Sequence, residues 1–317
     1  MGRKNSELIA VRDDELGVEL STSQPRRDVS VVIVNWNTRD ELSDCLTSVL
    51  ASDAIVPEII VVDNASCDGS VAVVQGEFPL VRIIRNEKNL GFARASNQGI
   101  EASRGRYVLL LNPDCIVYPG AFSQIVRFGD ANPDVGIFGV RILNPDGSVF
   151  ESCRRFPTLA AGVFRNAILA RLFPNNPYTR EYLMADWNHD TAREVDWVSG
   201  AALVMRRELL EDIGRLDERF FMYCEDVDIA YRAKERNWRV MYYPDAAVMH
   251  LRARSSDQNP VPMIVAFHRS MYAFFDKHYA ERSSLVTRAI VPLGLVFRTV
   301  LLIAHNRVFR LLKRRGS

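Results

Sequence analysis

The chain has 317 residues, of which 48% are hydrophobic and 25% are charged, and its formal net charge is +1. This length provides one large domain or two smaller ones with a sizeable core, and the composition excludes a disordered chain. The near-zero charge gives no basis for nucleic-acid binding, so no nucleic-acid partner is expected. The five cysteines are scattered and form no C-x-x-C motif, which argues against a disulfide framework or a zinc site and favours a reducing compartment.

The first half of the chain alternates strand and helix patterns. Residues 1–28 contain no apolar segment typical of a secretory signal, and we expect a mobile tail there. The run VSVVIV at 29–34 predicts a strand buried on both faces, followed by a helix over 38–52 with a capping box between Thr38 and Glu41. Further elements are predicted as strands at 58–64, 81–86 and 106–112 and a helix at 92–103. This alternation indicates an α/β fold with a doubly wound, mostly parallel sheet and helices on both faces.

The second half is less regular. The pattern predicts a helix near 122–128, strands at 135–140 and 149–155, and an irregular, partly helical region over 156–196. A strand leading into a helix is expected within 196–214. Residues 238–250 predict two short strands on either side of Pro244, because proline lacks the N–H that a strand interior needs.

Polar residues follow each of the first four predicted strands. In open parallel sheets, ligands bind beyond the carboxyl ends of the strands. The residues at these positions are amides and carboxylates: Asn35, Asn37, Asp63, Asn64, Asp68, Asn86, Asn112 and Asp114. Each could be an ordinary turn or cap residue, but their alignment on one edge favours a nucleotide site with a divalent ion. The chain contains no G-x-G-x-x-G and no G-x-x-x-x-G-K-[ST], which argues against a dinucleotide-dependent oxidoreductase and a P-loop enzyme.

The segment FFMYCEDVDIAYR at 220–232 places Glu225, Asp226 and Asp228 directly behind aromatic residues with the character of a buried segment. Carboxylates in the first turn of a helix are stabilised by its dipole, and Asp228 can pair with Arg232 at i, i+4. This structural explanation accounts for Asp228, whose substitution should therefore act mainly on stability. It leaves Glu225 and Asp226 as adjacent like charges, so a catalytic role remains equally open.

Five segments together resemble the family 2 glycosyltransferases over residues 29–255: VSVVIVNWNTRDELSDCLTSV, EIIVVDNASCDGS, NLGFARASNQGI, YVLLLNPD and FFMYCEDVDIAYRAKERNW. The resemblance implies the GT-A fold and transfer with inversion, and details such as VNWN and LNPD are most similar to the bacterial rhamnosyltransferase-like branch. It implies a GT-A domain at 29–256, with a nucleotide-binding half at 29–115 and an acceptor half at 116–256. The implied donor is dTDP-rhamnose or a UDP-sugar, and the acceptor is a hydroxyl of a glycan or polyprenyl-linked molecule in bacterial cell-surface polysaccharide synthesis.

The resemblance also implies a nucleotide site and a metal site. Asp63 matches the acid that contacts the nucleobase, and the other candidate nucleotide-binding residues are Asn35, Asn37, Asn64, Asn97 and Asn112. Asp114 matches the last acid of the D-x-D motif, which binds Mg²⁺ or Mn²⁺, and His250 matches a histidine that completes the metal site. Taken alone, His250 would be a core or turn histidine; its place after the strand that follows the Glu-Asp helix favours the metal. Asn112 replaces the first acid of D-x-D, so weaker metal binding is expected.

On the acceptor side, the resemblance implies that Asp226 is the general base and that Glu225 holds an acceptor hydroxyl or orients Asp226. Trp197, Ser199, Gly200 and Ala201 match the segment that lines the acceptor. Two other functions remain open: a nucleotidyltransferase that acts on a sugar phosphate, and a catalytically silent glycan-binding module. Release of nucleoside diphosphate from sugar nucleotides distinguishes the glycosyltransferase from both.

The C-terminal segment, 257–317, differs in composition. No acidic residue follows Glu281, whereas arginine and lysine accumulate among aliphatic residues. The apolar run at 289–304 contains Pro292 and Arg298 and is shorter than the about 20 residues that a membrane span needs. We expect an amphipathic helix on an anionic membrane surface, in a cytoplasmic protein held at the inner face of the cell membrane. The alternative is an amphipathic helix docked on the catalytic domain.

Overall fold

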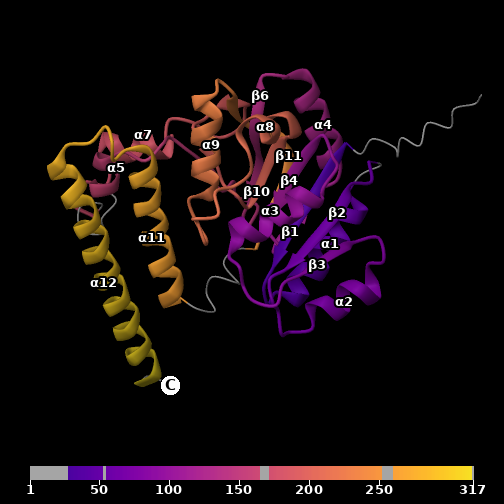
Figure 1. Cartoon of the computed structure of the whole chain (residues 1–317), viewed down its shortest axis with the longest axis horizontal. Helices are drawn as coiled ribbons and strands as arrows, with labels where there is room; N and C mark the ends of the chain where they lie inside the picture. The colour runs from indigo at the N-terminus through magenta and orange to yellow at the C-terminus, as the bar shows by residue number, and fades with distance from the viewer. Residues whose placement is uncertain (1–27, 53–54, 165–170, 252–259, 316–317) are drawn as a thin grey trace, which may run out of the picture.

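The computed structural model describes residues 28–52, 55–164, 171–251 and 260–315, and Figure 1 shows their arrangement. The mobile tail expected at 1–28 lies outside these residues except for Asp28. A central sheet with the strand order β3-β2-β1-β4-β10-β6-β11-β5 forms the middle of the molecule. Its first four strands are mutually parallel: β1 (Val29–Asn35), β2 (Glu58–Asp63), β3 (Arg82–Arg85) and β4 (Tyr107–Leu111).

The other half of the sheet is mixed, because β10 runs antiparallel to both of its neighbours, β4 and β6. Consequently β6 and β11, which pair in parallel, point the same way as β1. The strands of this half are β5 (Cys115–Val117), β6 (Val135–Leu143), β8 (Arg193–Glu194), β10 (Ala202–Arg206) and β11 (Arg239–His250). A second, two-stranded sheet consists of β7 (Cys153–Arg154) and β9 (Trp197–Val198).

Helices cover both faces of the central sheet (Figure 1). One face packs on α1 (Arg39–Ala51), α2 (Ser70–Glu77) and α4 (Ala121–Ala131). The opposite face packs on α3 (Phe92–Ala102), α8 (Arg207–Ile213) and α9 (Glu225–Glu235). Successive strand residues alternate between the two layers, so that Val31 and Ile33 pack with α1 whereas Val32 packs with α3. This explains why the predicted strands are apolar at most positions in a row, as strands buried on both faces are.

Three local predictions are wrong. Residues 239–250 form one strand and not two. A register shift between Tyr243 and Ala247 takes Pro244 out of the pairing with β6. The N–H that proline lacks is therefore not needed for a hydrogen bond of the sheet. The capping box is absent: the hydroxyl of Thr38 donates to Asn35 Oδ1 (2.7 Å), and Asp68 Oδ2 accepts from the first helical N–H of α1 (2.8 Å). The strand expected at 149–155 is reduced to Cys153–Arg154.

Beyond the sheet, two short helices, α5 (Leu159–Phe164) and α7 (Pro177–Leu183), precede β8. The chain ends in a hairpin of two long helices, α11 (Pro260–His278) and α12 (Leu285–Arg315), which lie side by side next to α9 (Figure 1). α12 continues through Pro292, and its segment Leu285–Asn306 is long and apolar enough to cross a membrane, with a mean hydropathy of 1.8. The expectation that this segment is broken and too short is therefore wrong.

The exposed side of α12 is its apolar side. No part of the apolar window is buried, and large exposed side chains include Val286, Ile290, Leu293, Phe297 and Val300. The alternative of a helix docked with its apolar face on the catalytic domain is therefore also wrong for the described part of α12.

Candidate active site

The loops after β1 and β2 are joined by side-chain hydrogen bonds at the carboxyl edge of the sheet. The Asn35 amide donates to Asp63 Oδ1 (3.1 Å) and to Ser66 Oγ (3.0 Å), and the Ser66 N–H donates to Asp63 Oδ2 (3.1 Å). Both loops contain a non-glycine residue with a left-handed backbone, Asn37 (φ 54°) and Ala65 (φ 67°). Such conformations are uncommon and persist where the surroundings hold them, often at functional sites. Asn37 is held by the Cys67 N–H, which donates to its Oδ1 (2.8 Å).

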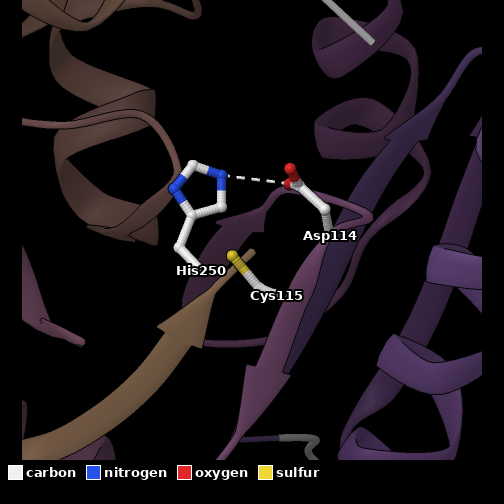
Figure 2. A group of neighbouring side chains, drawn as sticks. All are labelled: Asp114, Cys115 and His250. Atoms are coloured by element: carbon white, nitrogen blue, oxygen red, sulfur yellow. Dashed lines mark hydrogen bonds and ion pairs between the residues drawn. The ribbon is translucent and has the colours of Figure 1, made fainter. Parts of the chain in front are cut away.

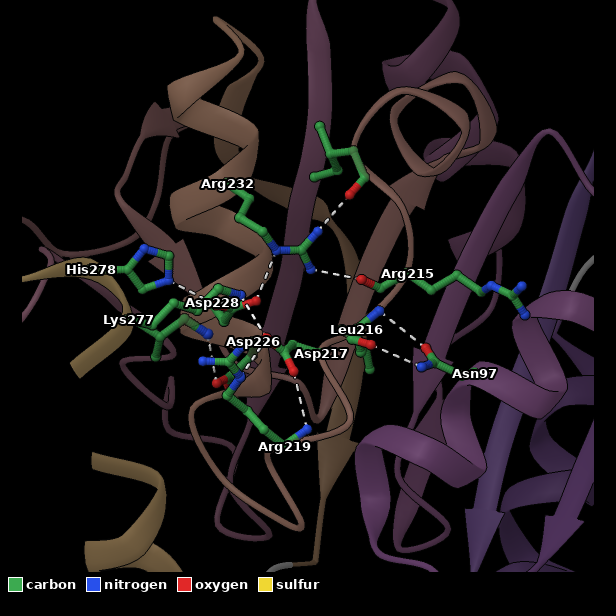
Figure 3. Close-up of polar contacts among 12 residues, drawn as sticks. Asn97, Arg215, Leu216, Asp217, Arg219, Asp226, Asp228, Arg232, Lys277 and His278 are labelled. Atoms are coloured by element: carbon green, nitrogen blue, oxygen red, sulfur yellow. Dashed lines mark hydrogen bonds and ion pairs between the residues drawn. The ribbon is translucent and has the colours of Figure 1, made fainter. Parts of the chain in front are cut away.

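The side chains of two candidate nucleotide-binding residues form hydrogen bonds with other loops of the protein. Asn64 is 2% exposed; its amide donates to Asn89 Oδ1 (2.9 Å), and its oxygen accepts from the Leu90 N–H (2.9 Å). Asn97, on α3, exchanges hydrogen bonds with both backbone groups of Leu216 (2.8 and 3.0 Å; Figure 3). The structure therefore brings Asn35, Asn37 and Asp63 together, with Asn35 and Asp63 themselves only 0% and 3% exposed, and it uses Asn64 and Asn97 to fix neighbouring loops.

The ends of β4 and β11 meet at the candidate metal site. The register pairs His250 with Cys115, and His250 Nε2 lies 3.0 Å from Asp114 Oδ1 and 3.3 Å from Asn112 Nδ2 (Figure 2). Asp114 is 5% exposed, and His250 Nδ1 is buried without a hydrogen-bond partner in the described part of the chain. Asp114, Cys115 and His250 form a group in which the potential ligand atoms lie within 4.8 Å of one another.

This group fits a hard divalent ion bound by Asp114 and His250. Two ligands at about 2.1 Å on adjacent octahedral positions lie about 3 Å apart, which agrees with the His250–Asp114 distance. Cys115 does not suit such an ion, because burial raises the pKa of its thiol well above the ordinary value and its sulfur donates to the Ala201 carbonyl (3.6 Å). It is a fully buried thiol, as expected.

The first turn of α9 presents the three carboxylates after a strained backbone turn. Tyr223 (φ 71°) and Cys224 (φ 66°) are consecutive left-handed residues, which redirect the chain from the aromatic segment into the helix. That segment is less buried than its sequence indicates: Phe220 is fully buried, but Phe221 is 43% exposed. The Phe221 carbonyl accepts from the Phe92 N–H at the start of α3 (2.6 Å) and so joins the segment before α9 to α3.

Glu225 and Asp226 differ in what stabilises their charge. Burial, and then the neighbouring Asp226, raise the pKa of Glu225 well above its usual range, and Glu225 Oε2 is buried with no hydrogen-bond partner among the described residues. Burial also raises the pKa of Asp226, but the N–H groups of Gly200 (3.0 Å) and Val227 (2.9 Å) donate to its carboxylate and oppose that rise. Asp226 is therefore the better-stabilised carboxylate and Glu225 the more readily protonated acid.

Asp228 is the most firmly bound of the three. It is 0% exposed and accepts hydrogen bonds from Arg232 Nε (2.8 Å), Lys277 Nζ (2.6 Å) and His278 Nε2 (2.7 Å; Figure 3). The expected pair with Arg232 is confirmed. Burial alone would raise the pKa of Asp228, but the bond from His278 and the charges of Arg232 and Lys277 together lower it to about 2.

The candidate acceptor segment connects the metal site to α9. The Ala201 carbonyl accepts from the Asn112 N–H (2.9 Å), and the adjacent Gly200 N–H donates to Asp226 Oδ2 (3.0 Å). Ser199 Oγ accepts from the Ala201 N–H (3.3 Å). Trp197 has a packing role: its indole N–H donates to the Arg155 carbonyl (2.9 Å), and its ring packs between two core clusters.

Two features of the site were not found from the sequence. The contribution of Gly200 is a backbone N–H aimed at Asp226, which no side-chain pattern encodes. Lys277 and His278 lie about fifty positions beyond Asp228, in a segment that was interpreted only for membrane binding. The only signal was the adjacent lysine and histidine themselves, and no helix was predicted to end at them.

Comparisons with known proteins identify the family and the fold. The family model described as Glycosyltransferase like family 2 matches residues 25–260. An N-acetylglucosaminyl-diphospho-decaprenol L-rhamnosyltransferase of Mycobacterium tuberculosis is 33% identical over 261 residues, which cover 78% of this chain and 84% of that protein. A low-salt glycan biosynthesis hexosyltransferase of Haloferax volcanii is 27% identical over 66% of this chain and 62% of its own length.

Two solved structures share the fold at low identity. GalNAc-T7 with UDP, GalNAc and Mn²⁺ has a TM-score of 0.54 and 17% identity, over 73% of this chain and 45% of that one. S. aureus TarS 1–349 in complex with UDP-GlcNAc has a TM-score of 0.52 and 15% identity, over 85% of this chain and 71% of that one. At these identities the likeness concerns the fold alone.

The Asp228 cluster generates a prediction about stability and pH. The folded pKa of about 2 is below the unfolded value of about 3.9, so the charged carboxylate stabilises the fold above about pH 4, and this contribution is lost as the pH falls through about 2. We expect Asp228→Asn to lower the free energy of unfolding by about 3 kcal/mol at pH 7, and by progressively less in acid. Urea unfolding of both proteins across this range measures the difference.

Asp130→Asn is the matched control, because Asp130 is also paired, with Arg106, but its side chain is 48% exposed. Exposed pairs contribute about 1 kcal/mol or less, so this variant should differ little from the parent. Equal losses for the two variants, or a loss for Asp228→Asn that does not depend on pH, would contradict the assignment.

Proposed function

The chain belongs to the family 2 glycosyltransferases and has their GT-A fold, and from this we propose the reaction and the residues that perform it. The enzyme transfers a hexose from a nucleoside diphosphate sugar, with inversion, to a hydroxyl of a lipid-linked or glycan acceptor in cell-surface polysaccharide synthesis. dTDP-L-rhamnose is the first donor to test, because the M. tuberculosis relative is named as an L-rhamnosyltransferase of a lipid-linked acceptor. UDP-sugars are the second.

The observation that carries this proposal is the continuous set of contacts across the site. Asp114 and His250 lie together, Asn112 is bonded to Ala201, and Gly200 is bonded to Asp226. A group suited to a cation and a group suited to a proton are thus fixed relative to each other by one short segment. Transfer of a sugar from a diphosphate requires these two functions on opposite sides of the anomeric carbon.

In the proposed mechanism, Asp63 and the loops that hold it bind the nucleoside at the carboxyl ends of β1 and β2. Asp226 accepts the proton of the acceptor hydroxyl as its oxygen attacks the anomeric carbon, and the diphosphate leaves from the opposite face with inversion. Glu225, as the protonated neighbour, donates a hydrogen bond to the acceptor or to Asp226. A divalent ion bound by Asp114 and His250 would supply positive charge to the leaving diphosphate.

The hairpin gives the proposal its membrane component. The apolar face of α12 points away from the catalytic domain. Arg298, in the middle of α12, is half-buried and faces α11. Burial is the larger cause of the lowered pKa of His268 on α11, and the charge of Arg298 lowers it further. In the sequence, basic residues flank the apolar segment of α12 on both sides: Arg282 and Arg288 on one side, and Arg307 and the residues after it on the other. We propose that this face lies in the cytoplasmic surface of an anionic membrane, where a polyprenyl-linked acceptor is found.

The first prediction concerns the general base. Asp226→Asn keeps the shape of the side chain and removes its basicity, so kcat should fall by about 10²–10⁴ while donor affinity is retained. The measurements are release of nucleoside diphosphate from dTDP-rhamnose and a UDP-sugar panel, and donor binding by calorimetry. Glu235→Gln, at the exposed far end of α9, is the control. Near-normal turnover of Asp226→Asn, or loss of donor binding in parallel with turnover, would remove Asp226 from this role.

The same assay separates the alternatives. A nucleotidyltransferase would form a sugar nucleotide from a sugar phosphate and would release no nucleoside diphosphate, and a silent module would release none with any donor. The family membership and the adjacent Glu225 and Asp226 favour the glycosyltransferase over both.

The second prediction concerns the metal. Asp114→Asn should weaken Mn²⁺ binding to the protein by more than about tenfold, because it removes a ligand of the ion. His250→Ala removes the other ligand and should weaken the binding to a smaller degree. Mn²⁺ paramagnetic resonance measures this binding without turnover, and Asp134→Asn, at the opposite end of the sheet, is the control. Activity should be lost in chelator and restored by Mg²⁺ or Mn²⁺. Full activity in excess chelator would contradict metal dependence.

The third prediction concerns the membrane. Full-length protein should float with anionic vesicles, whereas a truncation after Ser284 or the double variant Leu293→Asp, Phe297→Asp should not, because both remove the apolar face of α12. Leu80→Asp is the control, since Leu80 is as exposed but precedes β3 in the nucleotide half. Equal flotation of all four proteins would refute the proposal. Release by alkaline carbonate distinguishes a surface helix from a spanning one.

A further inference from the structure

The C-terminal hairpin is attached to the helix that begins with Glu225 and Asp226. Lys277 and His278, in the last turn of α11, donate to the buried carboxylate of Asp228 at 2.6 and 2.7 Å. One turn earlier, Phe274 packs against Phe220 and Val227. Ser270 Oγ donates to the Met222 carbonyl (2.8 Å), so α11 also contacts the strained turn directly before α9.

Lys277 connects two segments of the acceptor half at once. Its ammonium lies 2.8 Å from Asp217 and 2.6 Å from Asp228, and the side chain is only 19% exposed. Asp217 belongs to the loop whose neighbour Leu216 is bonded to Asn97 (Figure 3). Arg232, on the other side of Asp228, donates to the carbonyls of Ile213 and Arg215. The first turn of α9 is therefore fixed between α11 and the loop after α8.

Asp226 depends on this fixation because the turn that carries it has a strained backbone. Its carboxylate accepts only backbone N–H bonds from Gly200 and Val227 among the interactions described for it, and the turn before it contains two consecutive left-handed residues. Strained backbone persists only where the surrounding structure over-determines it. Asp228, two positions after Asp226 and hydrogen-bonded to the side chains of Arg232, Lys277 and His278, fixes the helical side of that turn.

We propose that Lys277 and His278 are positioning residues for the general base, acting through Asp228 to keep the carboxylate of Asp226 against Gly200. The inference rests on the proposed function, and it gives Asp228 a role beyond stability. It also gives α11 a role in the transfer step itself, in addition to carrying α12.

The kinetic test uses full-length protein with vesicles and the donor that the wild type accepts. Lys277→Met should lower kcat by about 10–100-fold with the donor KM unchanged, because a displacement of about 1 Å in the base costs that much without affecting the nucleotide side. Lys277→Arg retains the charge and the donors and should restore most of the rate. In an Asp226→Asn background, Lys277→Met should lower kcat no further, because its effect passes through the missing base.

Arg106→Met is the matched control. Arg106 also bridges two carboxylates, Asp28 and Asp130, at a similar 26% exposure, but at the opposite end of β4 from the site. Its loss should lower thermal stability and leave kcat unchanged. If Lys277→Met and His278→Gln behave as Arg106→Met does, the two residues are purely structural and the inference is wrong.

Hydrogen exchange supplies a readout that needs no turnover. The Gly200 amide is protected by Asp226, so its exchange should accelerate in Lys277→Met and stay unchanged in Arg106→Met. Unchanged exchange in Lys277→Met overturns the inference. Accelerated exchange in a protein that releases no nucleoside diphosphate from any donor supports the positioning effect and overturns the proposed function instead.

Discussion

The direction of one strand, β10, determines how the site is assembled. Because β10 runs antiparallel between β4 and β6, its first residues lie at the edge where β4 and β11 end. The segment before it, Ser199–Ala201, is thereby placed beside Asn112 and can reach Asp226 on α9. In a fully parallel sheet this segment would enter from the opposite edge, about five residues or 16 Å away. The reversal lets the parallel half of the sheet and the segment that reaches Asp226 share one edge.

The three carboxylates at the start of α9 have different environments although they lie within four positions. Glu225 is buried with an oxygen that has no described partner. Asp226 accepts hydrogen bonds from two backbone N–H groups, and Asp228 accepts them from three side chains, of which Arg232 and Lys277 are cations. The number and charge of the donors rank how readily each carboxylate ionises, although burial differs among them: Asp228 is fully buried and Glu225 nearly so, whereas Asp226 is half-buried. Adjacent acids therefore need not repel strongly, because the raised pKa of Glu225 favours its neutral form next to the better-stabilised Asp226.

The sequence predicts those parts of the structure that arise from local pattern. Periodicity identified β1 to β4 and helices α1 and α3, and the polar residues after each strand indicated the edge where Asn35, Asp63 and Asp114 lie. It could not tell that Asn64 and Asn97 turn their amides to Asn89 and Leu216, because an amide is equally suited to a loop contact and to a ligand. Pro244 was misleading for a related reason: the exclusion of proline from strands depends on pairing, and a register shift removes that dependence.

The other features that could not be predicted from the sequence are contacts between residues far apart in the chain. The Arg232–Asp228 pair is visible at i, i+4, but Lys277 and His278 reach the same carboxylate across about fifty residues, and no spacing rule covers that distance. The same contacts make α9, α11 and α12 one packed unit, with the base at one side and an exposed apolar face at the other. A membrane that bound this face would lie on the other side of α11 from Asp226, because α11 packs between α9 and α12 (Figure 1). For an acceptor whose lipid is anchored in that membrane, the fold would itself set how far the reacting hydroxyl extends from the surface.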